Sequence, residues 1–346
     1  MIESIQKISL EFEKNYQAIF NAPKLTQKYL NKRSDEFDQL IIDEFLKRNL
    51  ENDFAIVALG GYGRRELFPS SDIDLSIIQL IKKTKKIDDI KDFVGWLWTL
   101  KVKIGHSVRT VKDIDKITRT DLKEFTSYLS YRIIYCTKNK INDLNQNLEK
   151  ISLNWNKTKF FKAKKLEQLS RYQSFDSTEF SLEPDLKESP GCLRDFQTAL
   201  WVLEHCFEIK KLEDCIKSKL FNKTEIENIK RSYDHIKSLR FILNLNGNSN
   251  RISFENQLLL AKKSKLKSSK KSSAVEKFMR AFFLHASNLS DFNELVFQAY
   301  EDQLTIFKKP YSRDFYFFKD RLGISDRIDL VDKPEFILES LIKVGK

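Results

Sequence analysis

Two aspartates, two residues apart, are the side chains in this sequence best placed to do chemistry. Asp72 and Asp74 lie in DIDLSII, residues 72–78, whose alternating and then apolar pattern is typical of a β-strand. Side chains at i and i+2 point to the same face of a strand, so we expect both carboxylates on one face. Such a pair is hard to keep ionised without a divalent cation, and Mg²⁺ binds through one or two carboxylates plus substrate phosphates and water. The spacing therefore suggests a Mg²⁺ site, although the same pattern also occurs without a metal.

Two adjacent glycines, Gly60 and Gly61, precede the aspartates and could approach a phosphate. They follow FAIVAL, residues 54–59, an apolar run that we expect to form a buried strand. Backbone N–H groups in a turn without side chains can come close to phosphate oxygens. A short helical turn around Arg64–Leu67 would add its positive end, which favours anions. The glycines could equally serve only to form the turn.

The elements around these residues predict a small α/β domain. A helix is expected over 87–103 and a third strand over 106–111, which together with the strands at 54–59 and 72–78 make a domain of about 90 residues. The first 50 residues show helical periodicity, with these apolar residues on one face: Phe37, Leu40, Ile41, Phe45 and Leu46. From Asp121 onward the pattern is helical, with helices expected at 193–205, 223–245 and 275–304 and a break at 181–195. A small hairpin or an extended segment is expected at 314–330, followed by a short helix at 334–343.

The composition favours a helix-rich intracellular protein. The 346 residues are 41% hydrophobic and include only 9 Gly and 6 Pro, fewer turn residues than a β-sandwich or barrel needs. No stretch of 18 apolar residues and no signal-peptide core is present, so we expect a cytoplasmic protein without a membrane segment. The four cysteines and four histidines are scattered, which favours reduced thiols and disfavours a histidine-based metal hydrolase.

The net charge of +12 is open to two interpretations. It could mark an anionic partner, or it could reflect the amino-acid usage of a biased genome. The segment AKKSKLKSSKKSS, residues 261–273, could contact phosphates or form a solvated loop.

The order of these motifs resembles a known superfamily. An apolar strand, Gly-Gly, ten further residues and Asp-apolar-Asp is the pattern of the DNA polymerase β-like nucleotidyltransferases. The segment GGYGRRELFPSSDIDL, residues 60–75, is similar to the bacterial protein-PII uridylyltransferases. Further blocks resemble the same family in order, at residues 98–113, 180–202, 274–296 and 320–341. The resemblance implies an α+β, mainly helical chain, with a small polymerase β-like α/β domain and a helical domain. The expected division is an N-terminal helical segment at 1–50, the nucleotidyltransferase domain at 51–140, the helical domain at 141–310 and a C-terminal segment at 311–346.

The resemblance also implies a reaction. UTP would donate UMP to a tyrosine hydroxyl of the signal protein PII, with release of pyrophosphate. Asp72 and Asp74 would hold Mg²⁺, and Gly60 and Gly61 would hold the triphosphate. UTP and PII are the partners that this implies, and neither a membrane nor nucleic acid is expected as a partner.

Four further residues are candidates for the nucleotide cleft. Arg64 could contact phosphate or form a surface salt bridge, and Ser71 could bind a phosphate oxygen or cap the turn before Asp72. Lys187 and Arg194 lie beside Pro190-Gly191 and are expected to form the far wall of the cleft. The neighbouring Asp195 could share that wall or cap a helix.

The chain departs from the family pattern in three ways. Ser107 stands where many polymerase β-like enzymes have a third carboxylate, so the third metal ligand and the general base are not identified. Arg65 and Cys192 stand where the family has glycine, and a positive φ at Arg65 would cost about 1–2 kcal/mol. The sequence stops before the family's His-Asp hydrolase and ACT domains, so we expect neither uridylyl removal nor glutamine sensing. The sequence does not decide between a naturally reduced relative, a deliberately shortened chain and a truncated gene.

Two alternatives stay open from the sequence. The same fold could modify another acceptor, such as RNA or a small metabolite, and an RNA acceptor would make binding fall steeply with salt. The chain could also be a pseudoenzyme that only binds nucleotide or PII.

Overall fold

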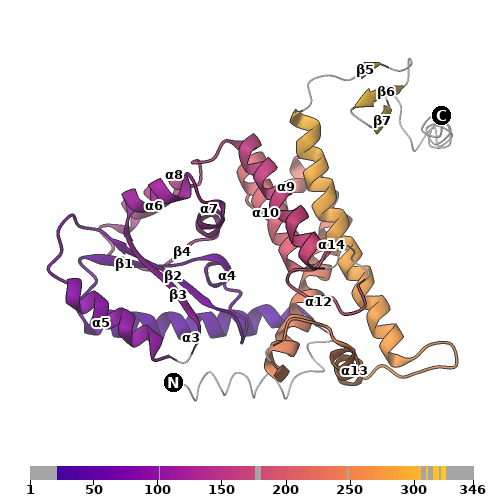
Figure 1. The fold of residues 1–346 in the computed structure, drawn as a ribbon, viewed down its shortest axis with the longest axis horizontal. Helices are drawn as coiled ribbons and strands as arrows, with labels where there is room; N and C mark the ends of the chain where they lie inside the picture. The colour runs from indigo at the N-terminus through magenta and orange to yellow at the C-terminus, as the bar shows by residue number, and fades with distance from the viewer. Residues whose placement is uncertain are drawn as a thin grey trace. The chain divides into compact units, whose positions relative to one another are not determined.

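The computed structural model describes residues 22–100, 102–175, 181–247 and 249–304, and the backbone of three short strands after them. The chain divides into two compact units, Met1–Val296 and Phe297–Lys346. The first unit contains a four-stranded sheet and most of the helices (Figure 1). The finer division at residues 50, 140 and 310 stays a prediction.

The sheet is formed by β1 (Phe54–Ala58), β2 (Ile73–Gln79), β3 (Ile104–Thr110) and β4 (Arg132–Tyr135), in the order β3-β2-β1-β4. β1 is antiparallel to β2 and β4, and β2 is parallel to β3. The three strands expected from the sequence are confirmed. The expectation of helix from Asp121 onward is wrong at β4, because Arg132–Tyr135 pairs with β1.

Helices cover both faces of this sheet (Figure 1). α3 (Leu25–Lys47) and α5 (Ile87–Trp98) lie on one face, and their apolar residues share a core with Ile56 and Ile77. α6 (Val111–Thr118), α7 (Leu122–Leu129) and α8 (Ile141–Ile151) lie on the other, where Val57 and Ile78 are buried. Leu46, which the periodicity of α3 placed on the buried face, is instead 37% exposed, because it follows Phe45 around the helix and away from the sheet.

Longer helices form the rest of the first unit. They are α9 (Lys157–Ser174), α10 (Leu193–Phe207), α11 (Asp214–Lys217), α12 (Lys223–Gly247), α13 (Phe254–Lys263) and α14 (Ala274–Leu304), the last of which crosses the boundary between the units. The helices expected at 193–205, 223–245 and 275–304 are confirmed. The lysine-serine segment begins inside α13 and continues as a loop.

The second unit contains three antiparallel strands, β5 (Lys309–Pro310), β6 (Phe315–Phe318) and β7 (Arg321–Ile324). β6 and β7 form the hairpin that the sequence predicts as one alternative, while the helix expected at 334–343 lies outside the described residues. The α+β, mainly helical fold class is confirmed. None of the described helices combines the length and the apolar character needed to cross a bilayer.

Candidate active site

Asp72 and Asp74 stand at the start of β2, where the strand leaves its preceding loop. Both residues are exposed, and within the described part of the chain neither carboxylate has a hydrogen-bond or ion-pair partner. Partial removal of the Asp74 carboxyl from water raises its pKa, and the adjacent negative charge of Asp72 raises it further. The two carboxylates are therefore close enough to repel each other, as a shared cation site requires.

Two glycines flank the Asp74 carboxylate. Gly105 of β3 is its partner in the parallel register, and a Cβ atom at Gly105 would lie 2.7 Å from Asp74 Oδ1. A Cβ atom at Gly60 would lie 3.4 Å from Asp74 Oδ2. The carboxylate thus occupies space that a side chain at position 105 would take.

The first of the expected glycines begins a short helix, α4 (Gly60–Gly63). The helical turn predicted at Arg64–Leu67 is therefore wrong in its position, since the helix has ended by Arg64. The N–H groups of Gly60 and Gly61 lie in the first turn, where no preceding helical carbonyl is available. Gly63 packs so closely that a Cβ atom there would lie 1.9 Å from the carbonyl oxygen of Ser130, which fixes the end of α4 against the end of α7.

Arg65 ends α4 in the left-handed conformation, with a φ of 59°. Its N–H donates to the Tyr62 carbonyl (3.1 Å), and the N–H of Glu66 donates to the Gly61 carbonyl (2.8 Å). This pair of bonds is the Schellman motif, whose left-handed position glycine usually occupies. The positive φ that was considered for Arg65 is therefore present.

Arg64, which follows α4, is half-buried. It donates to Glu66 Oε2 (2.9 Å) and to Ser130 Oγ (3.3 Å), so the ion pair weighed as an alternative is present. Its charge also acts on Asp74, whose pKa it lowers against the larger opposing effects. In this position the Arg64 guanidinium can bind an anion beside Asp74, while its ion pair with Glu66 fixes its orientation.

The loop from Glu66 to Ser71 is anchored in the helices. Buried Glu66 accepts a hydrogen bond from the Tyr233 hydroxyl of α12, and Arg240 lies 4.2 Å from the ring centre of Phe68. Burial alone would raise the pKa of the Glu66 carboxyl, but Arg64, Lys237 and the Tyr233 hydroxyl hold it below its ordinary value. The N–H of Ser71 donates to the Phe68 carbonyl (3.0 Å), which closes the turn before Asp72.

The second motif acts on the first electrostatically, through the charge of Lys187. Its charge lowers the pKa of Asp74 against the effects of burial and Asp72, so the segment before α10 lies on the side of the aspartates. Lys187 also pairs with Glu188 (3.4 Å). Arg194 donates to both oxygens of Glu188 (3.4 and 3.3 Å) and to Gln197 (3.3 Å).

Asp195 is a buried residue in the first turn of α10. It is fully buried and accepts hydrogen bonds from the Gly191 N–H (2.7 Å), the Tyr172 hydroxyl (2.6 Å) and Arg171. The N-cap of α10 is Cys192 and has no side-chain cap hydrogen bond, so Asp195 fixes the loop before α10 and the helical capping weighed as its alternative role is not found. Cys192, by contrast with Arg65, has an extended backbone with a φ of −102°, so a cysteine there is not strained.

Ser107 lies near the Tyr128 hydroxyl and lowers its pKa against the larger effect of burial, while Ser76 Oγ pairs with the same hydroxyl (2.7 Å). A further carboxylate comes from α7, where Glu124 is held by two hydrogen bonds from Arg109 of β3 (2.9 and 3.3 Å) and its charge contributes to raising the pKa of Asp74. Glu124 and Gly105 are not among the site residues predicted from the sequence. The GH pair that opens the third strand was a signal for Gly105, whereas nothing local distinguished Glu124.

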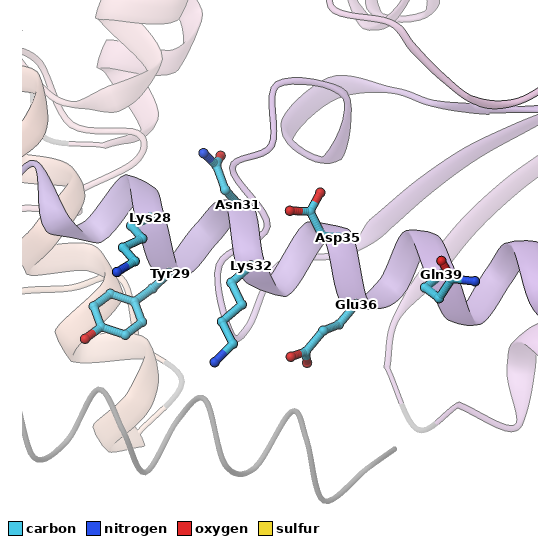
Figure 2. A pocket seen from close by; sticks show the side chains of 7 residues that line it. All are labelled: Lys28, Tyr29, Asn31, Lys32, Asp35, Glu36 and Gln39. Carbon is cyan, nitrogen blue, oxygen red and sulfur yellow. The ribbon is translucent and has the colours of Figure 1, made fainter.

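Two hollows accompany these features. One of about 210 Å³ lies between α7 and α10 and is lined by Arg64, Ser130, Gln197 and Trp201 among others. The other, of about 770 Å³, follows α3, and the described side chains that line it come from that helix (Figure 2). Its lining mixes basic, acidic and amide groups: Lys28, Tyr29, Asn31, Lys32, Asp35, Glu36 and Gln39.

The donor set at Asp72 and Asp74 suits magnesium. Among the described residues no group of three His, Cys, Asp or Glu side chains forms a complete metal site. Two unpartnered carboxylates fit a cation that takes its other ligands from phosphates and water. They do not fit a structural zinc site, which needs four protein ligands.

Comparison with known proteins relates the chain to one family. Residues 159–297 match the family described as GlnD PII-uridylyltransferase. A bifunctional uridylyltransferase/uridylyl-removing enzyme of Haemophilus influenzae (strain PittEE) is 31% identical over 318 residues, 89% of this chain and 36% of the relative.

Two other enzymes of the same description are similar to this chain. The enzyme of Pseudoalteromonas translucida is 32% identical over 84% of this chain and 34% of its own length. That of Hydrogenovibrio crunogenus is 28% identical over 99% of this chain and 40% of its own length. The chain thus spans little more than a third of the length of the relatives it matches.

Proposed function

This chain is related along nearly its whole length to part of the uridylyltransferase/uridylyl-removing enzymes, and we propose that it transfers UMP from UTP to a tyrosine hydroxyl of a PII signal protein. The observation that carries the proposal is the pair of unpartnered carboxylates, Asp72 and Asp74, beside the first turn of α4. Carboxylates that repel each other and have no partner contribute little to folding, so their place is best explained by a bound cation.

The charged groups around the pair have separate roles in this proposal. Asp72 and Asp74 would hold Mg²⁺, which supplies positive charge to the reacting phosphate and to the departing pyrophosphate. The N–H groups of Gly60 and Gly61 bind triphosphate oxygens, with Ser71 as a further donor. Arg64, Lys187 and Arg194 face the triphosphate from the helical side, with Arg64 and Arg194 oriented by Glu66 and Glu188.

The transfer forms a bond between the tyrosine oxygen and the α-phosphorus while the bond from that phosphorus to pyrophosphate breaks, and the hydroxyl proton is released to water. The chain contributes mainly position and charge, because phosphoryl chemistry needs little covalent help from the protein. Gly105 has no side chain and so leaves free the space that the Asp74 carboxylate occupies.

Intact-mass spectrometry tests the proposal. The source organism's PII is incubated with the chain, Mg²⁺ and each of the four nucleoside triphosphates separately. We expect a gain of one UMP with UTP alone, and no gain with Asp72→Asn or Asp74→Asn. These variants should unfold at the same urea concentration as the parent or a higher one, since each removes a repulsion and no hydrogen bond.

The other outcomes separate the alternatives. A mass gain with a different nucleotide would support nucleotidyl transfer to PII, with a donor other than UTP. No gain with any nucleotide from a folded chain would overturn the proposal, and would direct the next experiments to RNA acceptors and to nucleotide binding without turnover.

A further inference from the structure

Among the described residues, the edge of the sheet beside the aspartates carries no further strand. In the order β3-β2-β1-β4, β3 has β2 on one side, and no described strand pairs with its other side. An edge strand presents unpaired N–H and C=O groups that can bind another chain, and proteins usually protect such edges with short strands, charges, proline or bulges.

β3 has little of this protection. It is seven residues long, IGHSVRT, without proline and without an irregularity in its pairing with β2. Arg109 is its one fully charged residue, and this side chain is held by Glu124. Val108 is 42% exposed.

The register determines which groups of β3 face outward. The Ile73 N–H donates to the Lys103 carbonyl (2.8 Å), so residue 103 points its backbone groups toward β2. Backbone direction alternates along a strand, so Gly105, Ser107 and Arg109 also bond toward β2, whereas Ile104, His106 and Val108 present their N–H and C=O groups to the open side.

Gly105 leaves a path from this open side to Asp74. An added strand would lie about 4.8 Å beyond β3 and so about 10 Å from β2. On the face that carries Asp74, the residue of β3 between the two is Gly105, which has no side chain. A hydroxyl-bearing side chain on the added strand could therefore extend across β3 toward the carboxylate.

The opposite face of the edge offers an apolar contact. Trp98 at the end of α5 is 65% exposed, and its ring centre lies 5.6 Å from that of His106. Alternate side chains of an added strand point to this face, where they would cover the indole.

We propose that β3 binds an extended segment of the acceptor protein as an additional β-strand, which presents the reacting hydroxyl on the face of Asp74. The inference rests on the proposed function in that the acceptor is a protein. Main-chain hydrogen bonds supply the affinity in this mode of recognition, and alternate side chains supply the specificity.

Residue-resolved amide hydrogen exchange tests the contact directly. On addition of PII without nucleotide, the amides of His106 and Val108 should become protected, while those of Gly105 and Ser107, already bonded to β2, should not change. Absence of this alternation would overturn the proposal. Protection that appears without PII and grows with the concentration of the chain would overturn it in favour of a second copy.

A proline variant tests the same contact in turnover. Val108→Pro removes one outward N–H and leaves the bonds to β2 in place, while Val108→Thr keeps the N–H and the branched shape. We expect Val108→Pro to raise the KM for PII at least tenfold with an unchanged Kd for UTP, and Val108→Thr to behave as the parent. An unchanged KM in a folded Val108→Pro chain would contradict the proposal.

The two experiments separate this proposal from the proposed function. Amide protection by PII in a parent chain that transfers no UMP would support the docking edge and overturn the transfer. Transfer by the parent without protection would overturn the docking edge alone.

Discussion

Asp74 lies between two glycines, and a side chain would be unfavourable at each of them for a different reason. Gly60 has a φ of 54°, a conformation that side chains disfavour, whereas Gly105 gives up its volume to the Asp74 carboxylate. The geometry of the carboxylate therefore depends on a residue of the neighbouring strand.

Gly105→Ala should displace the carboxylate without unfolding the chain. Its Cβ atom would come within 2.7 Å of Asp74 Oδ1, and the flexible aspartate would rotate away. Misplacement by about 1 Å lowers rates by up to about a hundredfold, so we expect UMP transfer to fall about 10- to 100-fold. Gly95→Ala in α5 is the matched control, since nothing lies within 4 Å of its added atom. It should keep full transfer and gain about 0.5–1 kcal/mol of stability. Equal activities of the two variants would contradict the assignment.

Arg65 offers a test of strain at a helix end. Arg65→Gly and Arg65→Ala both lose the ion pair with Asp35, but only glycine relieves the φ of 59°. Urea unfolding should therefore find the glycine variant about 1 kcal/mol more stable than the alanine variant. Equal stability would show that the left-handed conformation carries no strain.

At the scale of elements, α12 and α14 enclose two histidines that the active site does not use. The rings of His235 and His285 lie 4.2 Å apart between centres, and Nε2 of His235 is buried without a hydrogen-bond partner among the described residues. Burial and the neighbouring His285 lower the pKa of His235 to about 3. Burial and the charge of Arg231 also lower the pKa of His285.

This packing predicts a loss of stability in acid. The folded pKa of His235 lies below the ordinary value of about 6.5, so the unfolded chain takes up the proton first and stability falls as the pH drops from about 6.5 toward 3. Between pH 7.5 and 5 the contribution is about 2 kcal/mol at most. Urea unfolding at both values should show a smaller acid loss for His235→Phe than for the parent. Identical losses would mean that the histidine does not resist protonation in the folded chain.

At the scale of the whole first unit, the loop between α4 and β2 joins the sheet to the helices. Glu66 accepts a hydrogen bond from the Tyr233 hydroxyl, and Phe68 packs against Arg240 and Phe241 of α12. The loop that leads to Asp72 is thus held by residues more than 150 positions further along the chain.

Removal of one hydroxyl should weaken this junction. Tyr233→Phe leaves a buried carboxylate short of one donor, which costs about 1–3 kcal/mol. Tyr131→Phe, which removes a half-exposed bond to Asn145 (2.7 Å), should cost less and serves as the control. Chemical denaturation measures both, and a Tyr233→Phe chain no less stable than Tyr131→Phe would contradict the structural importance of the junction.

Much of the fold and of the candidate site was readable from the sequence. Short-range patterns identified three of the four strands of the sheet, and the i, i+2 spacing of Asp72 and Asp74 identified the carboxylate pair, because strand periodicity is a local property. β4 was missed because the four residues RIIY form a strand only by pairing with β1.

The contacts that complete the site depend on the tertiary structure. Only the parallel register of β2 and β3 brings Gly105 to Asp74, only the packing of α7 brings Glu124 near it, and only the segment before α10 brings Lys187 to the same side. The conformation of Arg65 was likewise decided by the hydrogen bonds that end α4. The sequence by itself determined which groups could do the chemistry, because residue type and local spacing suffice for that. Their neighbours were decided by long-range pairing and packing, which no local pattern encodes.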